Sequence, residues 1–149
     1  MFGAAFGSAV HLLALAVGLA SIHLRARRLG EPLDDAGVRR VLAADNVWGI
    51  AALLWIGSGL ARLLWLEKSP DYFLRNGFFW VKMGLFGLSG ALEAWPMAVF
   101  MQWRIALAKG LAPDTSRAPL FHRTSRLQVA IIVAMLFVAP LMARGAWLF

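Results

Sequence analysis

Four long apolar stretches, separated by short polar connections, dominate the pattern of the chain. They cover residues 3–24, 46–66, 77–101 and 127–149. An α-helix rises about 1.5 Å per residue, so each stretch is long enough to cross the hydrocarbon core of a bilayer, which is roughly 30 Å thick. The pattern therefore predicts one domain over residues 1–149. Its fold class is all-α: an integral membrane bundle of four helices with up-down-up-down topology.

The composition supports a membrane protein and excludes several other classes. Hydrophobic residues make up 60% of the chain and charged residues only 15%, which is too few to cover the surface of a soluble protein. The absence of cysteine excludes disulfides, thiolate metal sites and iron–sulfur clusters. Although the formal net charge of +7 would suit a nucleic acid, the basic residues gather in the connections. We therefore expect membrane lipids as partners and no nucleic acid.

The Lys and Arg residues predict how the helices are oriented. The first and third connections are rich in basic residues, namely Arg25, Arg27, Arg28, Arg39 and Arg40 in the first and Arg104, Lys109, Arg117, Arg123 and Arg126 in the third. The middle connection has only Lys68 and Arg75. Basic connections favour the cytoplasmic side of a membrane. We therefore expect a bacterial inner-membrane protein whose two termini lie on the non-cytoplasmic side.

Polar residues near the ends of the spans predict local structure. Asp34 is placed to cap a turn of helix at the membrane surface before the second span. Thr124 or Ser125 is expected to cap the start of the fourth span. At the inner boundary, His23 and Asp45 are expected to form a solvated pair.

Small residues predict which span is most enclosed. The third span contains Gly84, Gly87 and Gly90. Lipid provides no hydrophobic drive for helix association, and small residues let two helix backbones approach closely. We therefore expect the third span to be the most enclosed of the four, with a kink at Pro96.

Four ionisable residues lie at similar depth in the membrane. Placing a charged side chain at the centre of a spanning helix costs about 2.5–3.5 kcal/mol, so such residues are candidates for function. His11 lies roughly 12 Å and Lys82 roughly 8 Å below the predicted outer boundary. Arg62 and Arg144 lie close to the outer ends of the second and fourth spans. All four spans thus contribute a candidate site residue to the outer half of the bilayer.

The chemistry of these residues suits a haem b cofactor between the first and third spans. Neutral histidine is the common axial ligand of haem, and a lysine amine ligates iron when its surroundings keep it unprotonated. We therefore predict that His11 and Lys82 are metal ligands. Arg62 and Arg144 would bind the cofactor through its propionates, near the interface. Glu93 shares a helical face with Lys82 and is a candidate for a proton path.

Each candidate residue also has an explanation that needs no ligand. His11 could form only a hydrogen bond between helices, and Lys82 could extend its amine to the outer headgroups. Arg62 and Arg144 could be interface anchors. Glu93 could be protonated, or bonded to a neighbouring helix. The sequence leaves these alternatives open.

Several short motifs resemble known families. They are Ser-Ala-Val-His-Leu-Leu at 8–13, Ala-Asp-Asn-Val-Trp-Gly-Ile at 44–50, Gly-Leu-Ala-Arg at 59–62, Asn-Gly-Phe-Phe-Trp-Val-Lys-Met at 76–83 and Met-Ala-Arg-Gly at 142–145. Over nearly its whole length the chain is similar to a family of small bacterial membrane proteins of unknown function. More distantly, its layout resembles the HemJ-type protoporphyrinogen oxidases and the CopD-type copper-resistance proteins. The HemJ resemblance implies haem b binding by a histidine early in the first span and a lysine early in the third, which correspond to His11 and Lys82.

Three hypotheses for the function follow. The first is a membrane protein that binds haem b or another tetrapyrrole and has a redox or porphyrin-handling role. The second is an enzyme, a protoporphyrinogen oxidase. The third is a non-catalytic accessory or scaffold subunit of a larger membrane complex, because the chain has little mass outside its apolar stretches. Its protein partners would then be the other subunits of that complex, or further copies of the chain in a homo-oligomer.

Overall fold

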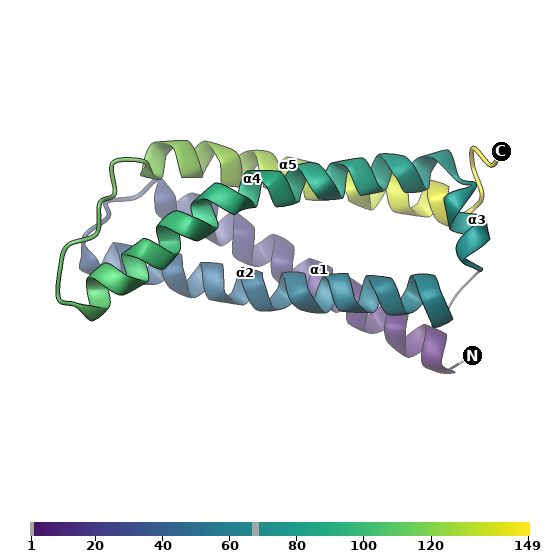
Figure 1. The fold of residues 1–149 in the computed structure, drawn as a ribbon, viewed down its shortest axis with the longest axis horizontal. Helices are drawn as coiled ribbons and strands as arrows, with labels where there is room; N and C mark the ends of the chain where they lie inside the picture. Colours follow the sequence, from purple (N-terminus) through teal and green to yellow (C-terminus); the bar gives the residue numbers. More distant parts are fainter. Residues whose placement is uncertain (1, 67–68) are drawn as a thin grey trace.

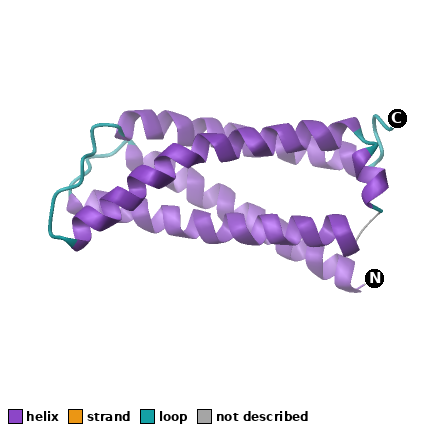
Figure 2. Cartoon of the chain, viewed as in Figure 1, coloured by secondary structure: helices purple, strands orange, loops and turns teal. Residues whose placement is uncertain are grey.

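The four apolar stretches are long helices in the computed structural model, which describes residues 2–66 and 69–149. They are α1 (Phe2–Leu29), α2 (Asp35–Ala61), α4 (Gly77–Ala108) and α5 (Ala118–Ala143). A π-helical turn, η1 (Arg62–Leu66), continues α2, and a short helix, α3 (Pro70–Leu74), precedes α4. Within the described residues there is no β-strand, so the all-α prediction is confirmed (Figure 2). Each long helix is sufficiently long and apolar to cross a membrane.

The helices form a ring in the order α1, α2, α4, α5. The most extensive contact is between α1 and α2. α5 packs against both α4 and α1, whereas α2 and α4 touch only sparsely. Both chain ends lie at one end of the bundle, together with α3, and we call this the terminal end (Figure 1). The connections over residues 30–34 and 109–117 lie at the opposite end, which we call the loop end.

The helices begin earlier at the loop end than the sequence predicts. Asp34 is the N-cap of α2, as predicted, and its Oδ1 accepts a 2.7 Å hydrogen bond from Gly37 N. From there α2 continues through the second span without a break. α5 begins at Ala118, so the prediction that Thr124 or Ser125 caps this helix is wrong: both lie inside it. A proline in the first turn of α5 explains the earlier start, because proline is favoured there.

α5, the helix of the fourth span, ends at Ala143, before the predicted boundary at residue 149. Gly145, with a φ of 74°, follows the last turn of α5. Its N–H donates to Met142 O, and the next N–H, that of Ala146, donates to Leu141 O. This is the Schellman pattern, which ends a helix at a glycine that can adopt a positive φ. The remaining residues turn back toward α4, where the Trp147 ring packs directly on Gly77.

The third span is less enclosed than the sequence predicts. Gly84, Gly87 and Gly90 are exposed, and a methyl group on any of them would meet open space. Close packing occurs elsewhere, for example where Gly18 of α1 lies against the Trp48 ring of α2. Pro96 is buried inside α4 and does not end it. One buried core cluster therefore joins α1, α2 and α5, and another joins all four long helices at the loop end.

Candidate functional site

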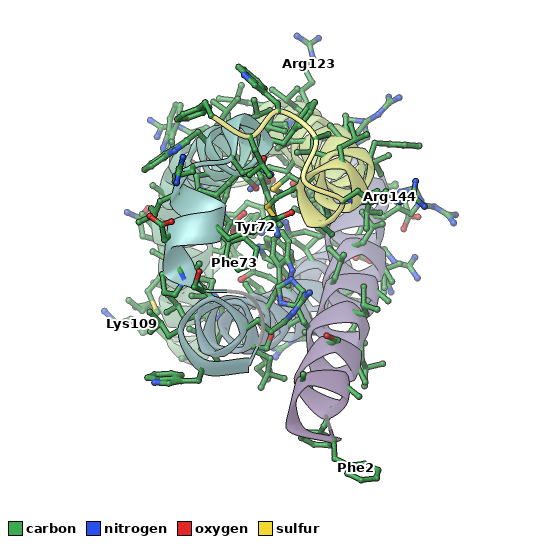
Figure 3. The ribbon with its side chains drawn as sticks, turned by 90° about the vertical axis from the view of Figure 1, so that its right-hand side faces the viewer. Phe2, Tyr72, Phe73, Lys109, Arg123 and Arg144 are labelled. Carbon is green, nitrogen blue, oxygen red and sulfur yellow. The ribbon has the colours of Figure 1, made fainter. Side chains whose placement is uncertain are left out.

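Three of the predicted site residues line one cavity near the terminal end of the bundle. The cavity has a volume of about 690 Å³, and its lining includes His11 of α1, Arg62 of η1 and Lys82 of α4. Its other walls are mostly apolar and include Phe73 of α3 and Met135 of α5. Figure 3 shows Phe73 pointing from α3 toward the middle of the ring of helices. The volume falls in the range of about 300–1,000 Å³ that is usual for small-molecule sites.

His11 is buried and its imidazole is held through both ring nitrogens. The Trp55 indole N–H donates to His11 Nε2 over 3.0 Å. Because Nε2 accepts, the ring proton of the neutral imidazole lies on Nδ1, which donates to Ser58 Oγ at 3.0 Å. The Ser58 hydroxyl in turn donates to Leu54 O over 2.6 Å. The hydrogen bond between helices, which the sequence left open as an alternative for His11, is therefore present, and it sets both the tautomer and the orientation of the ring.

A glycine on α2 leaves room for this imidazole. A methyl group at Gly59 would lie 3.2 Å from His11 Cε1, whereas one at Gly57 would meet nothing within 4 Å. On the opposite side, Trp55 makes an edge-to-face contact with Phe86 of α4, with ring centroids 5.9 Å apart. The imidazole is therefore enclosed by α2, and the indole that bonds it is in turn supported by α4.

Arg62 and Lys82 place two cations at the wall of the cavity. Both side chains are half-buried. Arg62 begins the π-helical turn η1, and its backbone N–H bonds to Ser58 O and Gly59 O at the end of α2. Such turns occur frequently at functional sites because they shift side chains relative to a regular helix. Since charges interact more strongly where water is scarce, these cations favour an acidic group in the cavity.

A second, smaller cavity adjoins the first on the other side of Trp55. It has a volume of about 190 Å³ and reaches toward the seam between α2 and α4, where Ile56 and Leu60 contribute to its lining. Among the described residues, the two cavities share six, namely His11, Trp55, Arg62, Phe73, Lys82 and Met142. The histidine and the two cations thus lie where the cavities meet.

Arg144, also predicted as a cofactor-binding residue, is not brought to this site. It is exposed at the C-cap of α5 and is not among the residues that line either cavity. Figure 3 shows its side chain extending away from the ring of helices. The early end of α5 explains this position, because the chain turns at Gly145 and leaves Arg144 on the outer surface.

A buried ionic cluster at the loop end was not predicted from the sequence. The Arg25 side chain has no solvent exposure and donates to Asp45 at 2.7 Å and to both Glu93 carboxylate oxygens at 2.6 and 2.7 Å. Arg104 donates to the other Asp45 oxygen at 2.6 Å. Gln128 accepts from Arg25 at 3.0 Å and donates to Glu93 at 2.8 Å. We call these five residues the loop-end cluster; they join α1, α2, α4 and α5.

The loop-end cluster corrects two expectations. Asp45 pairs with Arg25 and Arg104 and does not form a solvated pair with His23, which is exposed. Glu93 is bonded to neighbouring helices, one of the alternatives left open, so a role in a proton path would require Arg25 to release it. Two carboxylates and two guanidinium groups also balance each other in charge, which reduces the cost of burying them.

Two polar atoms near the loop-end cluster lack hydrogen-bond partners. Within the described part of the chain, Arg25 Nε and Ser125 Oγ are buried without one. The face of the Arg25 guanidinium lies over the Phe100 ring, with Cζ 5.5 Å from the ring centroid. This contact provides a favourable cation–π interaction but no acceptor.

A comparison with known protein families matches the chain from residue 4 to residue 146. The matching family is described as "Predicted membrane protein (DUF2214)". The chain belongs to this family. None of the curated proteins and none of the solved structures compared with the chain matches it. Membership agrees with the predicted family of small membrane proteins and with the four candidate spans.

Membership in the DUF2214 family does not assign chemistry to the cavity. The resemblance to the HemJ-type oxidases and the CopD-type proteins stays a prediction, since the family description names neither. Over residues 2–66 and 69–149, no three His, Asp or Glu side chains lie together where they could hold a metal ion. The chemistry available in the cavity comes instead from His11, Arg62 and Lys82 in its lining.

Proposed function

We propose that this protein binds a tetrapyrrole with acidic side groups, such as haem b, in the cavity at the terminal end. The observation that supports this proposal is that His11, Arg62 and Lys82, from three separate helical segments, line one apolar cavity. An apolar ring system suits the aromatic and aliphatic walls, and its carboxylates suit the two cations. When bound, haem would supply one-electron redox chemistry.

The geometry of His11 is compatible with metal ligation if the imidazole gives up its hydrogen bond with Trp55. A histidine that binds a metal through Nε2 usually donates its other ring N–H to a second group, as Nδ1 does here to Ser58. The Nε2 lone pair, however, accepts the N–H of Trp55. Iron ligation by His11 would therefore require the indole to move away.

Comparing haem with its dimethyl ester tests the proposal, because the ester keeps the ring and iron but loses the carboxylate charges. We would titrate each compound into protein reconstituted in lipid nanodiscs and follow the Soret band. In the Arg62→Gln, Lys82→Gln double variant, haem should bind at least about tenfold more weakly, as expected when hydrogen bonds to charged groups are lost. The ester should bind the double variant and the unaltered protein equally.

Arg144→Gln is the matched control, because it removes an exposed cation at the same end that does not line the cavity. It should leave haem affinity within twofold of the unaltered protein. Equal losses for haem and its ester, or the same loss in the control, would show that the two cations do not recognise carboxylates. His11→Ala should then show, through the position of the Soret band, whether His11 ligates the iron.

We also propose that the terminal end faces the non-cytoplasmic side of a bacterial inner membrane. The loop end supports this orientation because its connections and adjoining helix ends are rich in Arg and Lys. The chain has no cysteine, so single substitutions at Leu111 and Phe149 would give one thiol at each end. In intact cells, an impermeant maleimide should label the Phe149→Cys variant and spare Leu111→Cys. The reverse pattern would contradict the orientation.

A further inference from the structure

We propose that the ligand enters and leaves the larger cavity from the bilayer, through the seam between α1 and α5. The site would then take a molecule that is dissolved in the membrane, and not one that diffuses in from the aqueous phase. This inference rests on the proposed function, and it adds the route and the phase from which the ligand comes.

The first observation is the exposure of two residues that line the cavity. Leu12 of α1 is 59% exposed and Leu136 of α5 is 38% exposed, and both belong to the lining of the larger cavity. In a membrane these apolar side chains would contact acyl chains. A cavity wall that consists partly of lipid-facing side chains can be open to the lipid, because small rotamer changes of such residues widen it.

The second observation is how α1 and α5 diverge. At the loop end, Arg25 of α1 bonds Gln128 of α5 at 3.0 Å, and His122 Nδ1 of α5 lies 2.7 Å from Ala26 O. From this junction the two helices separate toward the terminal end (Figure 1). There α1 leaves the bundle, and Phe2, which is 94% exposed, lies far from α5 (Figure 3). The seam therefore opens where the cavity lies.

The third observation is that α3 and the residue before α4 are bonded to α5 at the terminal end. At the terminal end, Tyr72 of α3 donates its hydroxyl to Met142 O at 3.3 Å, and Asn76 Nδ2 donates to the same carbonyl at 3.2 Å. Arg75 bonds the backbone of Phe149, which ties the end of the chain to the connection between α3 and α4. An aqueous ligand that passed between α3 and α5 would have to break the contacts with Met142 O, whereas a ligand in the lipid would not.

The opposite seam, between α2 and α4, is the rival route. Leu60 of α2 is 52% exposed and contributes to the lining of the smaller cavity. That cavity, however, has a volume of only about 190 Å³, against about 690 Å³ on the side of α1 and α5. A tetrapyrrole needs the larger volume, and the lining of the larger cavity includes the exposed Leu12 and Leu136, so we assign access to the seam between α1 and α5.

Side chains that fill or widen this seam test the proposal. The filling variants are Leu12→Trp and Leu136→Trp, and the widening variant is Leu12→Ala. The matched controls are Leu13→Trp and Phe137→Trp, because these neighbouring residues are 66% and 73% exposed and do not line the cavity. Each protein is reconstituted into lipid vesicles preloaded with haem, and uptake and release are followed by stopped-flow absorbance at the Soret band.

We expect both filling variants to take up and release haem at least fivefold more slowly than the unaltered protein. Leu12→Ala should accelerate both steps, a change that a merely disturbed fold would not produce. The controls should change the rates less than twofold. Equal rates in filling variants and controls would overturn the proposal, as would slowing by Leu60→Trp alone. Failure of the unaltered protein to bind haem at equilibrium would instead overturn the proposed function, so the two failures are distinguishable.

Discussion

Replacing Arg25 by alanine is expected to destabilise the bundle far more than replacing Arg28, three residues later on the same helix. In the described part of the chain, Arg25 donates four hydrogen bonds, which reach side chains on α2, α4 and α5. Arg28 forms a 2.8 Å pair with Glu31, and both of those side chains are more than one third exposed. The two substitutions remove the same charged group from one helix but from different surroundings.

The expected magnitudes follow from what each substitution leaves behind. Without Arg25, Glu93 keeps only its 2.8 Å bond from Gln128 among these partners, while Asp45 keeps Arg104. Removing one member of a buried ion pair typically costs about 3–5 kcal/mol, because the remaining charge stays buried. An exposed pair such as that of Arg28 is worth about 0–1 kcal/mol, further reduced by salt.

Thermal unfolding in a mild detergent, followed by tryptophan fluorescence and circular dichroism, measures the difference. For a chain of this size, a loss of about 4 kcal/mol lowers Tm by on the order of 10 °C, and Arg28→Ala should lower it by about 2 °C or less. A double-mutant cycle of Arg25→Met with Glu93→Met then isolates their interaction. The double variant should recover much of the stability, because an apolar pair often replaces a buried ion pair without loss.

Similar Tm values for Arg25→Ala and Arg28→Ala would refute this reasoning. They would show that Arg25 reaches water in the folded protein, so that its burial by α4 and α5 is not maintained. A double-mutant cycle with no coupling between Arg25 and Glu93 would lead to the same conclusion.

Three further predictions concern the cavity and the loop end. Trp55→Phe removes the N–H that donates to His11 Nε2, so the affinity for haem should rise several-fold while the affinity for metal-free protoporphyrin stays constant. Titrations in which both affinities change alike would argue against iron ligation by His11. Gly59→Ala puts a methyl group against the same imidazole and should weaken haem binding, whereas Gly57→Ala on the same helix should not, and equal titrations would contradict the close fit. Hydrogen bonds from Ser116, mainly from its backbone N–H and then from its side chain, lower the pKa of Asp114 below its ordinary value. The turn that these bonds form should therefore persist at a pH above the ordinary pKa of an Asp and loosen as the pH falls through the lowered pKa. Asp114→Ala should therefore speed hydrogen exchange at the Ser116 amide at neutral pH, and unchanged exchange would show that the bond does not hold the turn.

The sequence predicted the helices well because hydrophobic length is a strong local signal. It also predicted that His11 and Lys82 lie at similar depth, and the structure places both at one cavity. It did not predict that Arg144 lies outside the cavity, because the position of this residue depends on where α5 ends. The signal for that end was available in Gly145, which suits a positive φ just after a helix.

The loop-end cluster illustrates why the remaining features were missed. The sequence places Arg25 in the first connection, together with Arg27 and Arg28. Yet Arg25 lies 14 residues after His11, close to four helical turns, and so shares a face with that buried side chain. Helical spacing therefore held the signal that Arg25 points inward. Which carboxylates it meets depends on how the four helices cross, and crossing angles are set by packing between residues distant in the chain.

A haem titration of the unaltered protein in lipid nanodiscs, followed at the Soret band, tests the central claim most directly. If the cavity lined by His11, Arg62 and Lys82 binds a tetrapyrrole, the band should shift and saturate at one haem per chain, and empty nanodiscs should show only linear partitioning. A protein titration that matches the empty nanodiscs, without saturation at any haem concentration, would contradict the account.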